Sequence, residues 1–179
     1  MSGAATVYSQ ALYGLAKDEG QEAAVLQQMT ALAESFRAEP DYIRLLCAAN
    51  LSKAERCEIL DRSFRGKVTS NLLNFMKLLT EKGYMRHFLE CCKVYRNLFN
   101  EDHGILEVTA VTATALTSAQ TMRLQEKLAA ITGKTISLQN SIDPACLGGV
   151  RLDYDGKRVD DTVQHRLDSI RALLSDTVL

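Results

Sequence analysis

The residues with the greatest potential for covalent chemistry are two adjacent cysteines, Cys91 and Cys92, with His87 one helical turn before Cys91. A histidine beside a cysteine can activate the thiol as a nucleophile when an acid orients the imidazole ring. On a helix, however, adjacent residues point about 100° apart, so at least one of the two thiols is expected to lie in a core. We therefore expect structural cysteines, and a cysteine nucleophile or a redox role for Cys91 or Cys92 stays an alternative.

Other short patterns resemble ligand sites without completing one. Residues 133–135 (GKT) end like a phosphate-binding loop, but Leu128 stands where that loop needs its first glycine. Residues 153–157 begin like a calcium loop but lack the glutamate that closes it. The three histidines fall on different predicted elements, without a second ligand at the spacing of a zinc site. The sequence thus predicts no catalytic, cofactor-binding or metal site.

Composition excludes several further classes of protein. The net charge is -1, and it is balanced locally: residues 1–104 carry 13 Lys and Arg against 13 Asp and Glu, and residues 105–179 carry 8 against 9. Neither part has the basic surface that binding to a phosphate backbone requires, so nucleic acid is not an expected partner. No apolar run is long enough for a membrane span, and the N-terminus lacks the features of a secretory signal. We expect no direct membrane insertion, and five irregularly spaced cysteines predict reduced thiols.

Apolar residues recur at helical spacing in six segments of residues 1–104. Pro40 ends the second segment, and Ser52 with Glu55 forms a capping box that begins the fourth. Thr69 or Ser70 can cap the fifth, which is apolar on nearly every side and is therefore expected to be surrounded by protein. Short connections between these helices predict a six-helix bundle.

The period changes near Gly104. Residues 106–114 alternate with period two and are rich in β-branched side chains, as are residues 135–142, which predicts two strands. Between them, Thr117 and Gln120 form a second capping box, and the helix that follows ends at Gly133. Residues 155–156 (DG) predict a hairpin turn.

A final helix is expected after Asp160 or Asp161, one of which caps it. The fold class is therefore mainly α with an α/β part: an N-terminal six-helix bundle, residues 1–104, followed by a small C-terminal α/β domain, residues 105–179. The second domain is near the lower size limit for a self-sufficient core, so we expect it to be stabilised by a partner.

The paired glycines Gly148 and Gly149 permit two interpretations. They can form a bulge or a tight entry into the strand that begins at Val150, which is the interpretation we favour. Alternatively, they allow the backbone of a partner to approach closely.

Five stretches, in order and at the right spacing, resemble one family. They are residues 8–16 (YSQALYGLA), 74–83 (NFMKLLTEKG), 108–117 (VTAVTATALT), 142–150 (IDPACLGGV) and 159–167 (VDDTVQHRL). This pattern resembles the delta subunit of the F-type ATP synthase, whose mitochondrial member is the oligomycin-sensitivity conferring protein. The sequence departs from the family at Tyr84-Met85, where Arg-Leu is common, at Cys146, where Leu is usual, and at Asp161-Thr162, which replace Gly-Ser.

The resemblance implies a non-catalytic stator subunit. It implies that the helical bundle binds the N-terminal helices of alpha subunits on the catalytic head, and that the C-terminal domain holds the b subunits of the peripheral stalk. It also implies one copy per complex, a monomer when isolated, and a place peripheral to the inner or plasma membrane on the cytoplasmic side of a bacterium. An unrelated helical-bundle adaptor is the alternative function.

The family places its head-binding groove between the first and fifth helices. On the first helix Tyr8, Leu12 and Leu15 form one stripe, and Val7, Ala11 and Gly14 form an adjacent stripe of small side chains. On the fifth helix Leu78 points away from the face shared by its other apolar residues, so it needs a partner. We expect an amphipathic helix to bind over a set of residues on both helices: Val7, Tyr8, Ala11, Leu15 and Leu78. The alternative is that these residues are internal core.

In the C-terminal domain, four residues of the family signatures are candidates for either partner binding or structure. They are Gly148, Gly149, Asp160 and Arg166. For Asp160 we expect a structural role at a helix N-terminus.

Overall fold

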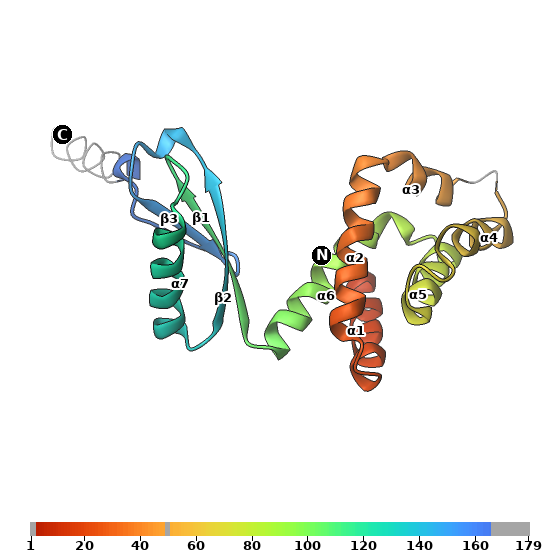
Figure 1. Cartoon of the computed structure of the whole chain (residues 1–179). Coiled ribbons are helices and arrows are strands. Elements are labelled where there is room, and N and C mark those ends of the chain that lie inside the picture. The colour runs from red at the N-terminus through yellow and green to blue at the C-terminus, as the bar shows by residue number, and fades with distance from the viewer. Residues whose placement is uncertain (1–2, 49–50, 166–179) are drawn as a thin grey trace, which may run out of the picture. The chain divides into compact units, whose positions relative to one another are not determined.

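The computed structural model describes residues 3–48 and 51–165, and these form a mostly helical chain with one small sheet (Figure 1). The chain divides into two compact units, Met1–Phe99 and Asn100–Leu179. The last helix of the first unit continues past Phe99 into the second. The assignment of separate roles to residues 1–104 and 105–179 stays a prediction.

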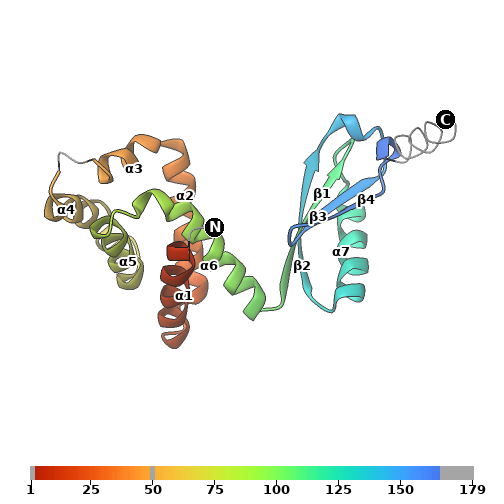
Figure 2. The same cartoon turned by 180° about the vertical axis from the view of Figure 1, so that it is seen from behind.

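The first unit consists of helices joined by short turns. In chain order they are α1 (Gly3–Asp18), α2 (Glu22–Ala38), α3 (Pro40–Leu46), α4 (Lys53–Phe64), α5 (Ser70–Glu81), a 3₁₀ turn (Met85–His87) and α6 (Phe88–Asp102). Pro40 separates α2 from α3, because it disfavours helical backbone at Glu39 and then serves as the first residue of α3. Figures 1 and 2 show this succession of helices from opposite sides.

One of the two expected helix caps in this unit forms. The Ser52 hydroxyl accepts from the Glu55 amide at 3.2 Å, and the Glu55 carboxylate accepts from the Ser52 amide at 2.8 Å, which is a complete capping box. Thr69 is the N-cap residue of α5, but its side chain makes no capping bond. Instead, its backbone N–H donates to the side-chain oxygen of Gln28 on α2 at 2.8 Å, a long-range contact that local spacing does not reveal.

A single apolar core lies among these helices. The largest of its fully buried side chains are Tyr95, Phe88, Met29, Leu46, Leu60, Leu72, Met76, Leu79, Met85 and Val25. The Phe36 ring is central, with ring centroids 5.2 Å from Phe88 and 5.6 Å from Tyr42. Each large apolar side chain buried in this way contributes about 1.5–3 kcal/mol, so the core stabilises helices too short to persist alone.

The apolar composition of α5 predicts a helix surrounded by protein on all sides, and the structure shows that this prediction is wrong. Asn74 and Leu78 are exposed, and Lys77 forms an ion pair with Asp61 of α4 at 2.7 Å. Hydrogen bonding from Lys77 lowers the pKa of Asp61, because the ammonium group favours the charged carboxylate. The α5 helix thus has a core face, an ion-paired side and an exposed apolar residue.

The second unit contains a four-stranded sheet with strand order β2-β1-β3-β4 in the described residues. The elements are β1 (Ile105–Thr112), α7 (Ser118–Thr132), β2 (Thr135–Ile142), a 3₁₀ turn (Pro144–Cys146), β3 (Val150–Tyr154) and β4 (Lys157–Asp160). Strands β1 and β2 are parallel and joined by α7, whereas β3 and β4 are added antiparallel. Val108 and Ala110, both buried, share the face of the sheet that carries Ile136.

The turns of this unit follow the predicted local chemistry. Asp155 and Gly156 have φ of 46° and 70°, as a two-residue hairpin turn with positive φ at both positions requires. The Thr117–Gln120 capping box is complete, and Gly133 ends α7 in the left-handed conformation.

Candidate functional site

The outer side of α1 carries large apolar side chains that no core residue covers. Val7 is 63% exposed and Leu15 is 56% exposed, and Ala11 lies between them one helical turn from each. Gly14 is also exposed, and a Cβ built there would meet nothing within 4 Å. The helix therefore offers an apolar strip with small residues at its centre, which another helix can approach closely.

Helix α5 lies beside this strip and runs antiparallel to α1. The Asn71 amide at the start of α5 donates to Glu19, just after α1, at 2.8 Å. At the opposite end, the Tyr8 and Tyr84 rings lie with centroids 6.0 Å apart. Leu78, 37% exposed, lies about halfway between these two ends and is therefore level with the stretch of α1 between Ala11 and Leu15. We call Val7, Ala11, Gly14, Leu15 and Leu78 the α1–α5 face.

The structure modifies the stripes expected on α1. Leu12 is buried and Tyr8 is half-buried against the core, whereas Leu15, expected in line with them, is exposed. Residues i, i+4 and i+7 drift around a helix by tens of degrees, so Leu15 leaves the buried side. The alternative that all of these residues are internal core is therefore wrong for Val7, Ala11, Leu15 and Leu78.

Buried contacts hold α1 in the orientation that exposes this face. The Ser9 hydroxyl donates to the Cys91 carbonyl of α6 at 3.1 Å, and both residues are buried. The Tyr13 ring packs edge-on against Tyr95 at 5.3 Å. Sequence reasoning did not single out Ser9, because its partner lies 82 positions away and leaves no periodic signal.

The adjacent cysteines are protonated core residues. Cys91 is fully buried, and Cys92 is buried with its thiol 3.7 Å from the Met29 carbonyl. Burial raises the pKa of the Cys91 thiol, and it raises the pKa of Cys92 to about 12. His87 pairs with Glu90 at 3.1 Å. A thiol with a raised pKa is a poor nucleophile, which argues against cysteine catalysis here.

The described residues contain neither a cluster of metal ligands nor a membrane-spanning helix. Among residues 3–48 and 51–165, no three His, Cys, Asp or Glu side chains converge as a metal site would require. In the same residues, no helix has the length and apolar character of a bilayer span.

The two glycines before β3 are approached by a backbone of the same chain. A Cβ at Gly149 would lie 2.4 Å from the Asp161 carbonyl oxygen, and φ there is +80°. The Val163 amide donates to the Gly148 carbonyl at 3.0 Å. Close approach is thus the reason for the glycine, but the approaching segment is internal. The hypothesis that a partner backbone occupies this position is wrong.

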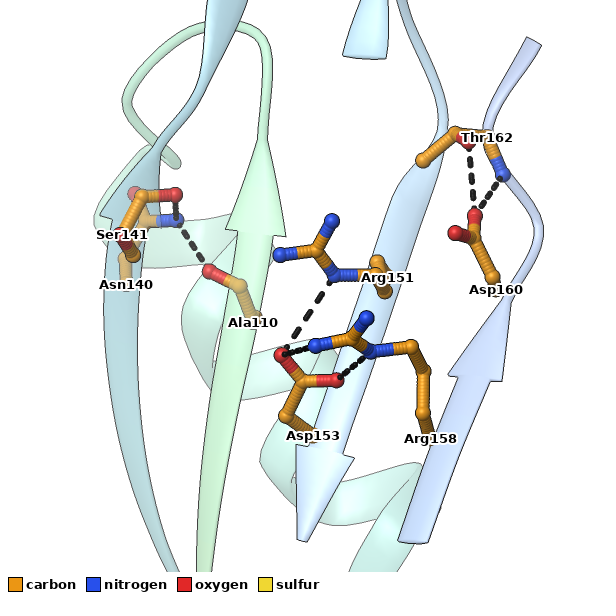
Figure 3. Close-up of polar contacts among 8 residues, drawn as sticks. All are labelled: Ala110, Asn140, Ser141, Arg151, Asp153, Arg158, Asp160 and Thr162. Atoms are coloured by element: carbon orange, nitrogen blue, oxygen red, sulfur yellow. Dashed lines mark hydrogen bonds and ion pairs between the residues drawn. The ribbon is translucent and has the colours of Figure 1, made fainter. Parts of the chain in front are cut away.

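Asp160 is structural, though it is not itself the expected cap. Its carboxylate accepts from the Thr162 amide at 3.0 Å and from the Thr162 hydroxyl at 2.7 Å (Figure 3). The Thr162 hydroxyl in turn accepts from the His165 amide at 3.2 Å, which is the N-cap bond. These bonds lower the pKa of Asp160. Arg166 and the rest of the predicted final helix lie outside the described residues.

The sheet also carries a charged cluster that sequence reasoning missed. Arg158 donates to Asp153 at 2.7 Å, and the Arg151 guanidinium lies 3.4 Å from the same carboxylate (Figure 3). Hydrogen bonding from Arg158 lowers the pKa of Asp153. The available signal was the predicted hairpin, since a two-residue turn at 155–156 places positions 153 and 158 opposite one another.

An exposed apolar face on a helical unit, a second small unit and buried, protonated thiols together define a protein that acts by binding other proteins. The family model described as ATP synthase delta (OSCP) subunit matches residues 4–174. The chain belongs to this family. It is a non-catalytic stator subunit of the F-type ATP synthase, the component that links the head to the peripheral stalk.

Individual relatives agree with this assignment over their whole lengths. The chain is 28% identical to the ATP synthase subunit delta of Alkaliphilus oremlandii, covering 94% of this chain and 93% of the relative. It is 32% identical to that of Lactobacillus gasseri, covering 95% and 93%. In fold, it is similar to a chain in the cryo-EM structure of the Toxoplasma gondii mitochondrial ATP synthase hexamer, with a TM-score of 0.72, 16% identity and coverage of 95% and 96%. The family match over residues 4–174 removes the alternative of an unrelated adaptor.

The packing around Gly149 predicts a strong dependence on the missing side chain. Gly149→Ala should destabilise the second unit by more than the roughly 1–2 kcal/mol that a left-handed conformation alone costs, because the added Cβ also meets the Asp161 carbonyl. Gly156→Ala is the matched control, with φ of +70° and open space around its Cβ. Urea unfolding with hydrogen exchange of β1 and β3 measures both effects. Equal losses from the two variants would contradict the close approach.

The burial of the thiols predicts their reactivity. In the native protein at pH 8, Cys47 should react with a thiol reagent. Cys91 and Cys92 should react at least roughly a hundredfold more slowly. Because their pKa values are raised, both thiols stay protonated at pH values at which an ordinary cysteine thiol has ionised. Mass spectrometry of labelled peptides measures this, and urea-unfolded protein, in which all five cysteines should react, is the control. Rapid labelling of Cys91 or Cys92 in the folded chain would revive the nucleophile hypothesis.

Proposed function

We propose that the first unit is a six-helix bundle that binds the catalytic head, and that the α1–α5 face is its contact. The observation that supports this most directly is the uncovered apolar strip of Val7, Ala11 and Leu15 beside the exposed Leu78. Exposed apolar side chains gathered in this way are typical of a site for an amphipathic helix. The family's head partner, the N-terminal helix of an alpha subunit, has that character. Tyr8, half-buried at the edge of the strip, forms its boundary.

The energetics of such a contact suit a stator. Burying the exposed parts of Val7, Leu15 and Leu78 contributes on the order of 1 kcal/mol or more for each side chain, and salt does not screen this term as it screens ion pairs. The small residues Ala11 and Gly14 allow the incoming helix to approach closely. The contact can therefore resist rotation of the head without any change in covalent bonds.

The second unit, in this proposal, holds the b subunits of the peripheral stalk. It is small, and several of its large apolar side chains are exposed, which favours stabilisation by a partner. Gly148, Gly149 and Asp160 support that unit from within rather than contact the partner. We further propose one copy per complex, a monomer when isolated, and a position peripheral to the membrane on the cytoplasmic side of a bacterium, since the relatives compared above include bacterial subunits.

The proposal gives the chain a mechanical role. The central rotor turns inside the head, and a head without a stator would turn with it. A connector with one contact at each end prevents that rotation, so proton flow and nucleotide chemistry stay coupled.

A charge placed in the centre of the α1–α5 face tests the head contact. Ala11→Asp should weaken binding to the isolated head roughly tenfold to a hundredfold, because a carboxylate would be buried against apolar side chains. Gln27→Asp is the matched control, since it adds the same charge to an exposed position of α2, outside the α1–α5 face. Binding is measured by titration calorimetry, and circular dichroism checks that both variants are folded. If Ala11→Asp binds as the wild type does, the head contact lies elsewhere.

Removing the second unit tests the two-ended connector. A fragment of residues 1–104 should still bind the head but should not join it to the stalk. In reconstituted membranes, ATP hydrolysis should persist while ATP-driven proton pumping falls to background. Full-length protein added in parallel should restore pumping. Normal pumping with the fragment alone would contradict the division of roles between the two units.

A further inference from the structure

Strand β2 forms one edge of the sheet, and half of its backbone groups point away from β1. The Thr135 amide donates to Gly104 and the Asp143 amide donates to Thr112, both at 2.9 Å, so odd-numbered residues face β1. Because successive residues of a strand point in opposite directions, the even-numbered N–H and C=O groups face outward. These residues are Ile136, Leu138, Asn140 and Ile142.

The two edges of this sheet differ in how they are protected. Exposed edge strands are usually short or carry charges or proline, which discourage pairing with another chain. Strand β4 follows that rule, with four residues of which Lys157, Arg158 and Asp160 are charged. Strand β2 does not: it has eight residues, Thr-Ile-Ser-Leu-Gln-Asn-Ser-Ile, with no charge and no proline. Among residues 3–48 and 51–165, no strand pairs with its outer edge.

The surroundings of this edge indicate which segment fits. On one side of the sheet a side chain of α7 reaches the edge, where Gln125 donates to the outward Ile136 carbonyl at 3.4 Å. Met122, one turn earlier on the same flank of α7, is 59% exposed, and Ile142 is 57% exposed on that side of the sheet. The other side presents exposed polar residues: Ser137, Gln139 and Ser141. An added strand would therefore be apolar toward α7 and polar on its other face.

The single copy per complex proposed above argues against a second copy of this chain as the occupant within the synthase. Symmetric pairing of two β2 edges requires two copies of the chain, whereas an extended segment of another subunit requires only one.

We propose that the outer edge of β2 binds, by strand addition, an extended and uncharged segment of another ATP synthase subunit, with apolar side chains at alternate positions facing Met122 and Ile142. The inference rests on the proposed function in one respect, namely that the chain is assembled with other subunits. It adds a main-chain contact to the side-chain contacts of the α1–α5 face.

Hydrogen exchange resolved by residue tests the proposal on the purified chain and on the assembled synthase. The amides of Leu138, Asn140 and Ile142 should exchange freely in the purified chain and slow about tenfold or more in the complex. The Gln139 and Ser141 amides, which face β1, should change little. Unchanged exchange of the outward amides in an intact complex overturns the strand proposal and leaves the stator function untouched. If the outward amides become protected in the purified chain as its concentration rises, the occupant is a second copy of this chain, and this result also overturns the strand proposal.

A substitution at Ile142 separates main-chain pairing from simple coverage. Ile142→Pro removes one outward N–H at an exposed position, which an edge strand tolerates, and Ile142→Ala keeps that N–H while shortening the same side chain. With strand addition, the proline variant should lose the protection of the Leu138 and Asn140 amides in the complex, and the alanine variant should retain most of it. Equal behaviour of the two variants means that the partner only covers the edge. A wild-type chain that fails to enter the complex at all refutes the proposed function itself.

Discussion

Burial of the inner side of α1 is the interaction on which the rest of the first unit depends. Leu12 and Ala16 lie in the core, the Ser9 hydroxyl bonds to the backbone of α6, and Tyr13 packs on Tyr95. Because these contacts fix the rotation of α1 about its own axis, they also determine which residues remain outside. The α1–α5 face is a consequence of that packing, and a rotation of one residue would bury Leu15 and turn Ser9 and Tyr13 away from their partners on α6.

The second unit depends on a contact of a different kind. Its sheet closes against the segment that follows β4, where the Asp161 carbonyl lies against Gly149 and Asp160 accepts two bonds from Thr162. These main-chain and cap contacts add to the burial of apolar side chains such as Val108 and Ile136. Among the described residues of this unit, no strand pairs with the long outer edge of β2, and several apolar side chains are exposed. Internal backbone contacts thus hold the unit together while its outside remains available for binding.

A connector needs surfaces and stiffness rather than reactive groups, and the chemistry of the side chains agrees. The thiols that first suggested a nucleophile are buried and protonated, and Asp61, Asp153 and Asp160 have lowered pKa values because each is held by a neighbouring donor. Charged groups in this chain form ion pairs between neighbouring elements: Lys77 of α5 pairs with Asp61 of α4, and Arg158 of β4 pairs with Asp153 of β3.

The sequence by itself determined the features that depend on neighbours within a few residues. Both capping boxes, the turn at Asp155–Gly156 and the end of α7 at Gly133 were predictable, because capping and positive φ are decided by local hydrogen bonds and sterics. Only the tertiary structure decided that Leu15 faces outward, that Thr162 rather than an aspartate caps the segment after β4, and that the backbone approaching Gly149 is internal. The outward side of Leu15 and the approach to Gly149 depend on contacts between residues distant in sequence, which leave no periodic trace in the order of amino acids. The Thr162 cap is a local bond, but two adjacent aspartates could also cap that segment, so the sequence left the choice open.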